Sequence, residues 1–426
     1  MLSDGLKYQD SRMATCEEMK QDLAPFALHD ATAKSKGGPV LLRDGDTVYT
    51  DPSDSHSLIV GDTGSMKTLR FVLPLIYSCA AADESMVIVD PKGELARKSE
   101  SFLSAKGYKT VIINMRDPQR SPDTWNPMGV IERAYKSGEE GQQKAVLQLN
   151  DMLNDIFFRR VDTKDPYWNE SAGQLALGIC LLLLALGEKL NMQNLLKWRY
   201  EKLADGTLDK CFRNLPTDGE IYQNLAGYLG MTAENTKSCI RSTFDQLVRV
   251  FKSAPALTEM LNDTSFDIER IGEAKAAVFV VIPDEKTTFH FLATLFISQC
   301  YTTLLETAER HGGSLPRRTN IILEEFCNLP ALGDIVPMIT AARSRNIRLH
   351  MVIQSYGQLV EKYGENVSRA ILDNCGNMIY LHTREMDFLT YISRLAGNNE
   401  YGRPLISTSR LQRLQKNETI IFHGRC

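Results

Sequence analysis

One stretch in the first third of the chain constrains the fold more than any other. The apolar run Leu58-Ile59-Val60 leads into a loop with two glycines, and the pair Lys67-Thr68 then opens a helical pattern. A buried strand, a loop and a helix in this order typically bind phosphate, because backbone N–H groups and the helix N-terminus attract anions. The spacing predicts that Lys67 reaches the outer phosphates of a nucleotide and that the Thr68 hydroxyl holds Mg²⁺.

The loop itself is expected to provide the remaining phosphate contacts through its backbone N–H groups. The usual pattern, G-x-x-x-x-G-K-[ST], has glycine immediately before the lysine, whereas this chain has Met66. A side chain at that position can crowd a backbone that must approach the phosphates closely. The loop residues expected to bind the nucleotide are Gly61, Asp62, Thr63, Gly64, Ser65 and Met66, followed by Lys67 and Thr68.

Length and composition limit the class of protein. The 426 residues are enough for two or three domains, and the formal charge is −4, from 53 acidic and 49 basic side chains. Any nucleic-acid partner must therefore meet a local basic surface, since the chain as a whole is not basic. The nine cysteines include no C-x-x-C pair, which argues against a zinc site or a disulfide framework and favours a reducing compartment.

Hydropathy predicts neither a signal peptide nor a transmembrane helix. The first twenty residues are polar and charged. The longest apolar run, Leu175 to Leu186, is well short of the roughly twenty residues that cross a bilayer, so we expect a buried helix there. Membrane attachment would then come from a partner or from a segment outside this sequence.

The order of the expected elements indicates an α/β protein with an insertion. Residues 1–50 are expected to form an N-terminal edge segment. Apolar strands alternate with helical patterns in 51–145 and again in 271–426, which predicts a mainly parallel sheet with right-handed crossovers. Between them, 146–270 reads as helix after helix and predicts an inserted all-α domain, whose charged faces are more often plain solvated surface than a binding site.

Acidic residues follow two of the expected strands, where ligands lie in open α/β sheets. Asp90 follows a four-residue apolar strand and is a candidate nucleotide contact, with a helix cap or turn residue as the alternative. Glu324 and Glu325 follow a later strand. A phosphate loop needs a carboxylate for the metal and an acid that polarises the attacking water, so the pair is interpreted as these two groups instead of surface charge.

Two further polar positions fit the same chemistry. Three arginines lie between 343 and 348, and one of them can reach the phosphates of a neighbouring subunit, as arginine fingers do. Gln354 ends the next strand and can orient the attacking water or report the γ-phosphate. Such polar strand ends are common in α/β sheets, so their weight comes from order and spacing.

These motifs, in this order, resemble the TraG/TraD class of type IV secretion coupling proteins, the conjugative DNA-transfer ATPases. The resemblance spans nearly the whole chain, and its most specific string is Asp90-Pro91-Lys92-Gly93-Glu94-Leu95. The other strings are Gly61 to Thr68, Trp125-Asn126-Pro127, Glu324-Glu325-Phe326, Ala342-Arg343-Ser344-Arg345 and Gln354-Ser355.

The resemblance implies a RecA-like nucleotide-binding domain with an inserted all-α domain, assembled as a ring, usually a hexamer, at the cytoplasmic face of the membrane. Such proteins bind ATP and Mg²⁺, receive a relaxase-bound DNA strand or a protein substrate, and feed it to a secretion channel. By motif position, Glu324 would serve the metal, Glu325 would be the base, Arg343 the finger and Gln354 the sensor. The inserted helices would face the substrate.

Three departures from the family pattern leave the activity open. Met66 replaces the loop glycine, Glu324 replaces the usual aspartate, and the two N-terminal transmembrane helices of the family are absent from this sequence. The leading hypothesis is a coupling ATPase, and the alternative is an adaptor of the same fold that docks substrate without hydrolysing ATP. A chromosome-segregation or viral-packaging motor fits the nucleotide-binding motifs equally well, but the D-P-K-G-E-L string and the helical insertion count against it.

Overall fold

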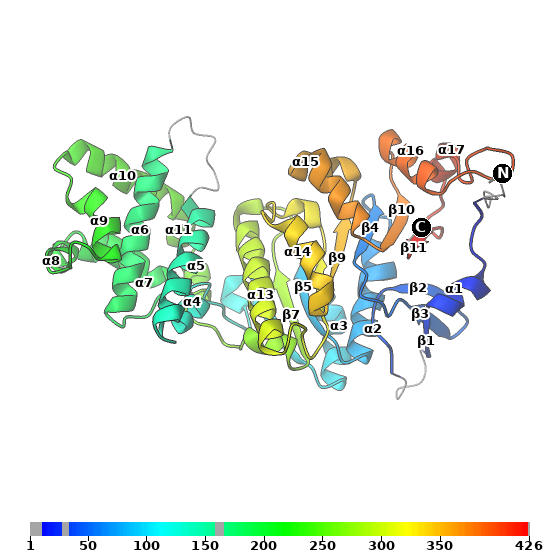
Figure 1. Cartoon of the computed structure of the whole chain (residues 1–426), viewed down its shortest axis with the longest axis horizontal. Helices are drawn as coiled ribbons and strands as arrows, with labels where there is room; N and C mark the ends of the chain where they lie inside the picture. Colours follow the sequence, from blue (N-terminus) through cyan, green and yellow to red (C-terminus); the bar gives the residue numbers. More distant parts are fainter. Residues whose placement is uncertain (1–10, 28–33, 158–165, 425–426) are drawn as a thin grey trace, which may run out of the picture. The chain divides into compact units, whose positions relative to one another are not determined.

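The structure is a computed structural model that describes residues 11–27, 34–157 and 166–424. The chain forms two compact units (Figure 1). Unit 1 comprises Met1–Ile112 and Ile268–Cys426, and unit 2 comprises Ile113–Asp267.

Unit 1 is organised around an eight-stranded sheet with the strand order β11-β10-β4-β9-β8-β5-β7-β6. Every neighbouring pair from β10 to β7 is parallel, and β11 runs antiparallel to β10 at the edge. The predicted mainly parallel α/β sheet is therefore confirmed. The strands are β4 (Ser57–Gly61), β5 (Ser85–Asp90), β6 (Lys109–Asn114), β7 (Ala276–Val281), β8 (Thr319–Leu323), β9 (Ile347–Ile353), β10 (Asn377–His382) and β11 (Ile420–His423).

Helices cover both faces of this sheet (Figure 1). The connections through α2 and α3 move along the sheet in one direction, and those through α13, α14 and α15 move in the other. Because parallel crossovers are right-handed, the two groups of helices lie on opposite faces. The helices are α2 (Leu73–Ala81), α3 (Glu94–Ala105), α13 (His290–Arg310), α14 (Ile335–Ala342) and α15 (Tyr356–Asp373), with α16 (Met386–Leu395) and α17 (Thr408–Gln412) after β10.

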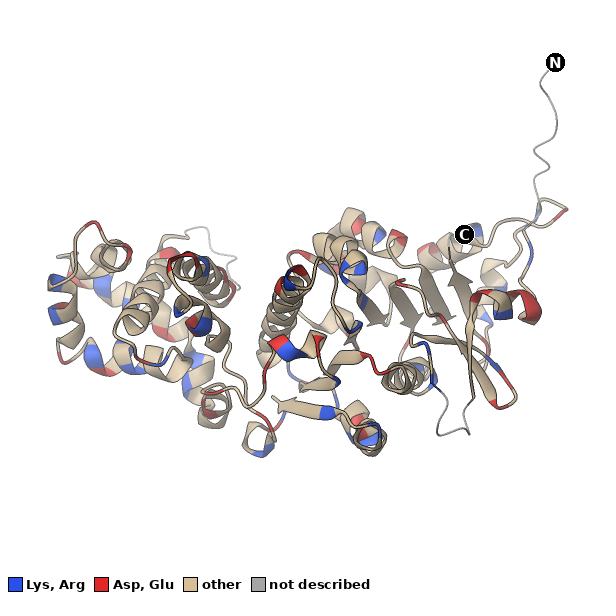
Figure 2. Cartoon of the chain, turned by 60° about the horizontal axis from the view of Figure 1, so that its bottom comes forward, with Lys and Arg blue, Asp and Glu red and all other residues tan. Residues whose placement is uncertain are grey.

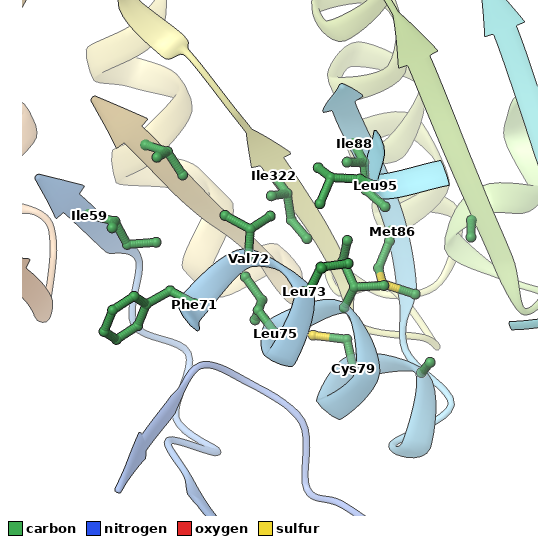
Figure 3. Close-up of a cluster of buried hydrophobic side chains, with 14 of the residues drawn as sticks. Ile59, Phe71, Val72, Leu73, Leu75, Cys79, Met86, Ile88, Leu95 and Ile322 are labelled. Carbon is green, nitrogen blue, oxygen red and sulfur yellow. The ribbon is translucent and has the colours of Figure 1, made fainter. Parts of the chain in front are cut away.

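The core of unit 1 packs α2 against one face of the strands (Figure 3). Met86 and Ile88 lie two residues apart on β5, so both point to the face that Leu75 and Cys79 of α2 cover. These side chains are fully or almost fully buried, and each contributes roughly 1.5–3 kcal/mol by leaving water. The packing fixes the helix, and with it the loop that connects the helix to β4.

The N-terminal part of unit 1 forms its own small sheet in the order β1-β3-β2. The helix α1 (Cys16–Asp22) begins with a capping box between Thr15 and Glu18. A hairpin turns around Asp44-Gly45-Asp46, with Gly45 at φ 57° in the turn. The three strands are β1 (Ala24–Ala27), β2 (Val40–Asp44) and β3 (Thr47–Thr50).

Unit 2 is helical around α6, which is predominantly buried and contacts α5, α9 and α10. Gly178 lets α9 approach α6, since a Cβ there would lie 2.7 Å from Leu225. The helices are α4 (Gly129–Tyr135), α5 (Glu139–Phe157), α6 (Tyr167–Ala185), α7 (Met192–Lys197), α8 (Thr207–Arg213), α9 (Glu220–Leu229), α10 (Glu234–Leu247), α11 (Arg249–Ser253) and α12 (Pro255–Met260).

Among the described residues, α6 is the one helix long and apolar enough to cross a membrane, and 72% of its apolar window is buried inside the protein. Burial of this kind is what a core helix of a helical unit shows.

Unit 2 begins earlier in the sequence than the expected insertion. The expected boundary between 145 and 146 falls inside α5, a continuous helix, whereas the compact unit starts at 113. The reason is the Trp125-Asn126-Pro127 string: Trp125 is buried and its backbone N–H donates to the carbonyl of Met260, and the side-chain amide of Asn126 donates to the carbonyl of Leu190. These bonds hold the entering chain against α12 and the segment before α7.

Candidate functional site

The predicted phosphate loop connects β4 to the first helix of unit 1. Its lysine is buried inside the loop: the Lys67 Nζ donates to the carbonyl of Gly61 and, at 3.1 Å, to that of Asp62. The Ser65 hydroxyl donates to the same Asp62 carbonyl at 2.7 Å. Burial lowers the pKa of Lys67, while the carboxylates of Glu325, Asp62 and Glu324 oppose that shift. The lysine is thus the cation at the centre of an acidic site.

Met66 occupies a left-handed backbone conformation with φ 64°. Glycine adopts this conformation freely, whereas an L side chain pays roughly 1–2 kcal/mol, so the structure explains why the pattern has glycine here. The methionine side chain is 40% exposed. The sequence departure therefore carries a backbone strain, and its effect on nucleotide binding stays a prediction.

The helix after the loop begins with a single wide turn. Residues Thr68–Val72 form a π-helical turn, in which the N–H of Leu73 donates to the carbonyl of Thr68, five residues earlier. Isolated π turns inside helices frequently occur at functional sites. Here the turn carries Thr68, whose hydroxyl donates to the Glu324 carboxylate, and so joins the first and second motifs of the site.

Glu324 is a partly buried acidic group at the carboxyl ends of the strands, and its pKa is raised. Burial raises its pKa to about 7, and the neighbouring carboxylates of Asp90, Glu325 and Glu94 add to the increase, while the bond from Thr68 opposes it. A strongly shifted carboxyl among other carboxylates is typical of a site that receives a cation.

Glu325 lies at the end of a hydrogen-bonded path from the phosphate loop. The Thr63 hydroxyl donates to Gln354 Oε1 at 3.3 Å, and the Gln354 amide donates to Glu325 Oε2 at 2.7 Å. Glu325 itself has φ 54°, a left-handed conformation that is unusual for a residue other than glycine and that recurs at functional sites. The structure thus brings three predicted residues from three separate segments into direct contact.

Asp90 makes the contacts of a helix cap. Its two carboxylate oxygens accept from the N–H groups of Glu94, at 3.1 Å, and Ala96, at 2.9 Å. Gly93, in the turn between Asp90 and Glu94, has φ 64°. Burial raises the pKa of Asp90. The D-P-K-G-E-L string therefore builds the start of α3 beside Glu324, and a nucleotide contact by Asp90 stays a prediction.

Arg343 lies away from the phosphate loop of its own chain. It follows α14 and precedes β9, so it lies at the amino ends of the parallel strands, whereas the loop follows the carboxyl end of β4. Its guanidinium pairs with Asp54 at 2.9 Å, and both side chains are nearly half exposed. The structure therefore does not bring Arg343 to the phosphate loop of its own chain, and its role as a finger for another copy stays a prediction.

Two residues of the site are not among those predicted from the sequence. The Asn328 amide donates to Glu325 Oε2 at 3.3 Å, and the His382 ring lies 2.9 Å from the Asp62 carboxylate. His382 ends β10, the strand beside β4, and only the strand order makes them neighbours. Asn328 is three residues after Glu325, a spacing that could have drawn attention had the turn been anticipated.

The oxygen atoms of Thr68 and Glu324 suit Mg²⁺ bound together with a nucleotide better than a metal held by protein side chains alone. Within the ranges that the structure describes, no group of three or more His, Cys, Asp or Glu side chains could hold a metal ion. Mg²⁺ is commonly held by one or two carboxylates, a hydroxyl and the phosphates of a nucleotide. Thr68 and Glu324, already in contact, provide the first two kinds of oxygen.

Comparison with known proteins agrees with this geometry. A family model described as type IV secretory system, conjugative DNA transfer, matches residues 9–424. The chain belongs to this family. Its motifs in the phosphate loop and after β8 are the parts of the family pattern that the structure brings together.

Curated relatives of the chain include two kinds of transfer protein from Rhizobium radiobacter. The conjugal transfer protein TraG is 21% identical over 418 residues, covering 94% of this chain and 62% of the relative. The protein VirD4 is 23% identical over 393 residues, covering 88% of this chain and 53% of the relative. The chain thus spans between about half and three fifths of the length of these relatives.

Solved structures show the same fold. The plasmid coupling protein TrwB, in complex with the non-hydrolysable ATP analogue ADPNP, superposes with a TM-score of 0.68 at 17% identity and covers 98% of this chain and 92% of TrwB. TrwB in complex with ADP and Mg²⁺ gives 0.67. VirB4 of Thermoanaerobacter pseudethanolicus gives 0.53 at 16% identity. The predicted RecA-like P-loop fold is confirmed.

Proposed function

We propose that this chain is the nucleotide-binding part of a coupling protein that binds ATP with Mg²⁺ and drives a DNA–relaxase complex or a protein substrate into a type IV secretion or conjugation channel. One observation carries the proposal: the phosphate loop, the Glu324-Glu325 pair and Gln354 come from three strands of the sheet and are joined by hydrogen bonds at one edge. The description of the family, type IV secretory system and conjugative DNA transfer, supports the transfer of DNA through a secretion system, and the names of two relatives, conjugal transfer protein TraG and plasmid coupling protein TrwB, agree with it.

The residues divide the work of hydrolysis among them. Lys67 would leave the loop carbonyls and bind the outer phosphates, and Thr68 and Glu324 would hold Mg²⁺, which neutralises charge on the phosphates when it is bound. Glu325 would accept the proton of the attacking water, so that water oxygen bonds to the γ-phosphorus, the bond to the β-phosphate oxygen breaks, and ADP and phosphate leave. Gln354 would orient that water.

The assembly belongs to the same proposal. A ring, usually a hexamer in proteins of this class, would bring Arg343 of one copy to the phosphates of the next, where it would replace its bond to Asp54. Membrane association at the cytoplasmic face would come through an anchor or a partner outside this sequence. Unit 2, with acidic and basic side chains interspersed over its helices (Figure 2), would contact the substrate.

Binding and turnover test the proposal together. We expect a fluorescent ATP analogue to bind in a Mg²⁺-dependent manner, and the chain to hydrolyse ATP, with both lost in Lys67→Ala but not in Lys98→Ala, a control on the exposed face of α3. Binding without hydrolysis would instead favour the adaptor, which shares the fold and docks substrate. No binding by the natural chain would overturn the proposal.

A further inference from the structure

The turn after β8 holds the carboxylate of Glu325 in a way that the motif does not require. Two side-chain amides donate to this carboxylate, and both donate to the same oxygen, Oε2: Gln354 at 2.7 Å and Asn328 at 3.3 Å. Within the described part of the chain, Oε1 has no hydrogen-bond partner from the protein. One oxygen is held and the other is available.

The direction of these bonds follows from the chemistry of the groups. An ionised carboxylate only accepts, so each amide must turn its NH₂ group toward Glu325. This leaves Gln354 Oε1 facing the phosphate loop, where the Thr63 hydroxyl donates to it at 3.3 Å. The Glu325 carboxylate therefore fixes the orientation of the Gln354 amide, and the Thr63 hydroxyl, which can donate or accept, donates to the amide oxygen.

The main chain at Asn328 is held by other bonds. Its N–H donates to the Glu325 carbonyl at 2.8 Å and closes the 3₁₀ turn Phe326–Asn328, and its carbonyl lies 2.9 Å from the buried ring of His290. The Phe326 ring stacks on Tyr363 of α15 with centroids 5.5 Å apart. None of these contacts uses the Asn328 side chain, whose amide donates to Glu325.

We infer that Asn328 is a positioning residue for the reaction: together with Gln354 it clamps Oε2 of Glu325, so that Oε1 faces the attacking water as the proton acceptor. The inference rests on the proposed function. Two donors on one oxygen fix the rotation of the carboxylate, which a single donor leaves free. Since small misplacements of a catalytic group reduce rates strongly, loss of the Asn328 donor should lower turnover and leave nucleotide binding intact.

The experiment compares Asn328→Asp and Asn328→Leu with the natural chain. Both variants keep the size of the side chain and remove the donor, and the aspartate also adds a carboxylate beside Glu325. For Asn328→Leu we expect kcat to fall roughly 10- to 100-fold with the Kd for a Mg²⁺-bound ATP analogue unchanged within about twofold, and for Asn328→Asp we expect kcat to fall at least as far. Asn328→Gln, which keeps a donor on a longer arm, should retain more activity than Asn328→Leu. Asn374→Asp, whose amide bonds to a backbone carbonyl of its own helix, is the matched control and should behave as the natural chain.

A double-variant cycle separates positioning from a structural role. If Asn328 acts through Glu325, then Asn328→Leu should not lower the residual single-turnover rate of Glu325→Gln any further. A further loss in that background, or unchanged kcat in Asn328→Leu, would overturn the inference while leaving the proposed function standing. A natural chain that does not hydrolyse ATP would overturn both, because Glu325 would then have no reaction to serve.

Discussion

Charged side chains gather at both ends of the parallel strands in the large sheet: where the strands end, here called the carboxyl edge, and where they begin, the amino edge. The two groups differ in how many of their hydrogen bonds are made within the protein. At the carboxyl edge, Lys67 bonds to carbonyls of its own loop and Glu325 keeps one oxygen without a protein partner in the described chain. At the amino edge, Arg348 is 1% exposed and pairs with Glu84, and its guanidinium also bonds to Asn320 at 2.9 Å and to the Ser53 carbonyl at 3.2 Å. The carboxyl edge therefore keeps polar groups that can bind a ligand, whereas those of Arg348 at the amino edge are paired within the protein.

The histidines at the two edges differ in exposure and not in the number of their bonds. At the amino edge, burial lowers the pKa of His56 to about 4, and its Nδ1 accepts from the N–H of Leu349 at 3.0 Å, so the ring is neutral and structural. At the carboxyl edge, His382 is partly exposed, and its two ring nitrogens lie 2.9 Å from the Asp62 carboxylate and 3.4 Å from the Gln412 carbonyl. The comparison of the two edges therefore rests on Lys67, Glu325 and Arg348, and four experiments can sharpen or break it.

The largest effect is expected at the carboxyl edge. Glu325→Gln should lower ATP hydrolysis about 10²- to 10⁴-fold, the usual contribution of a general base, while binding of a fluorescent ATP analogue persists. Glu365→Gln, on the exposed face of α15, is the control. Equal losses in the two variants would mean that the bond pattern at Glu325 does not mark a catalytic group.

Arg348→Met tests the amino edge. It removes the nearer of two cations from the buried Glu84 and leaves Arg318 at 3.7 Å, and we expect a loss of up to about 3–5 kcal/mol in the free energy of unfolding, measured with urea. Arg343→Met removes an exposed pair with Asp54 and should cost less than about 1 kcal/mol. Similar costs for the two arginines would break the distinction between a satisfied buried pair and an exposed one.

Glu324 connects stability with pH. Its folded pKa, raised to about 7, lies above that of the unfolded chain, so the folded state holds the extra proton between roughly pH 4.5 and 7, and stability falls as pH rises through this range. Glu324→Gln removes this cost and should raise the melting temperature at pH 8 by roughly 2–4 °C for each kcal/mol relieved, with no gain at pH 5. A gain that is the same at both pH values would show that burial of the charge is not the cause.

Met66→Gly should have the smallest effect. Relief of the left-handed backbone, roughly 1–2 kcal/mol, is offset by the larger conformational freedom of glycine in the unfolded chain, roughly 0.5–1 kcal/mol. We expect nucleotide affinity to change by no more than about fivefold, the equivalent of 1 kcal/mol. A much larger gain in affinity, measured with the same ATP analogue, would show that Met66 impairs the loop and would favour the adaptor.

The sequence by itself determined the local elements and the order of the motifs. An apolar run before Gly61 can only be a buried strand, and the repetition of strand and helix after it requires a parallel sheet, because hydrophobic periodicity and right-handed crossovers leave few alternatives. The strand that precedes Glu324 and the edge strand β11 follow from the same patterns.

Only the tertiary structure decided which of these residues meet. In the sheet, β9 and β8 lie between β4 and β5. This order brings Thr68 to Glu324, more than 250 residues later in the sequence, and Glu325 to Gln354, about 30 residues later. The helix cap by Asp90 is by contrast a local contact, made to N–H groups four and six residues later, and the place of Arg343 before β9 follows from the order of the elements along the chain. Spacing along a chain fixes local geometry, whereas contacts between distant segments depend on how the sheet is threaded, which no local pattern encodes.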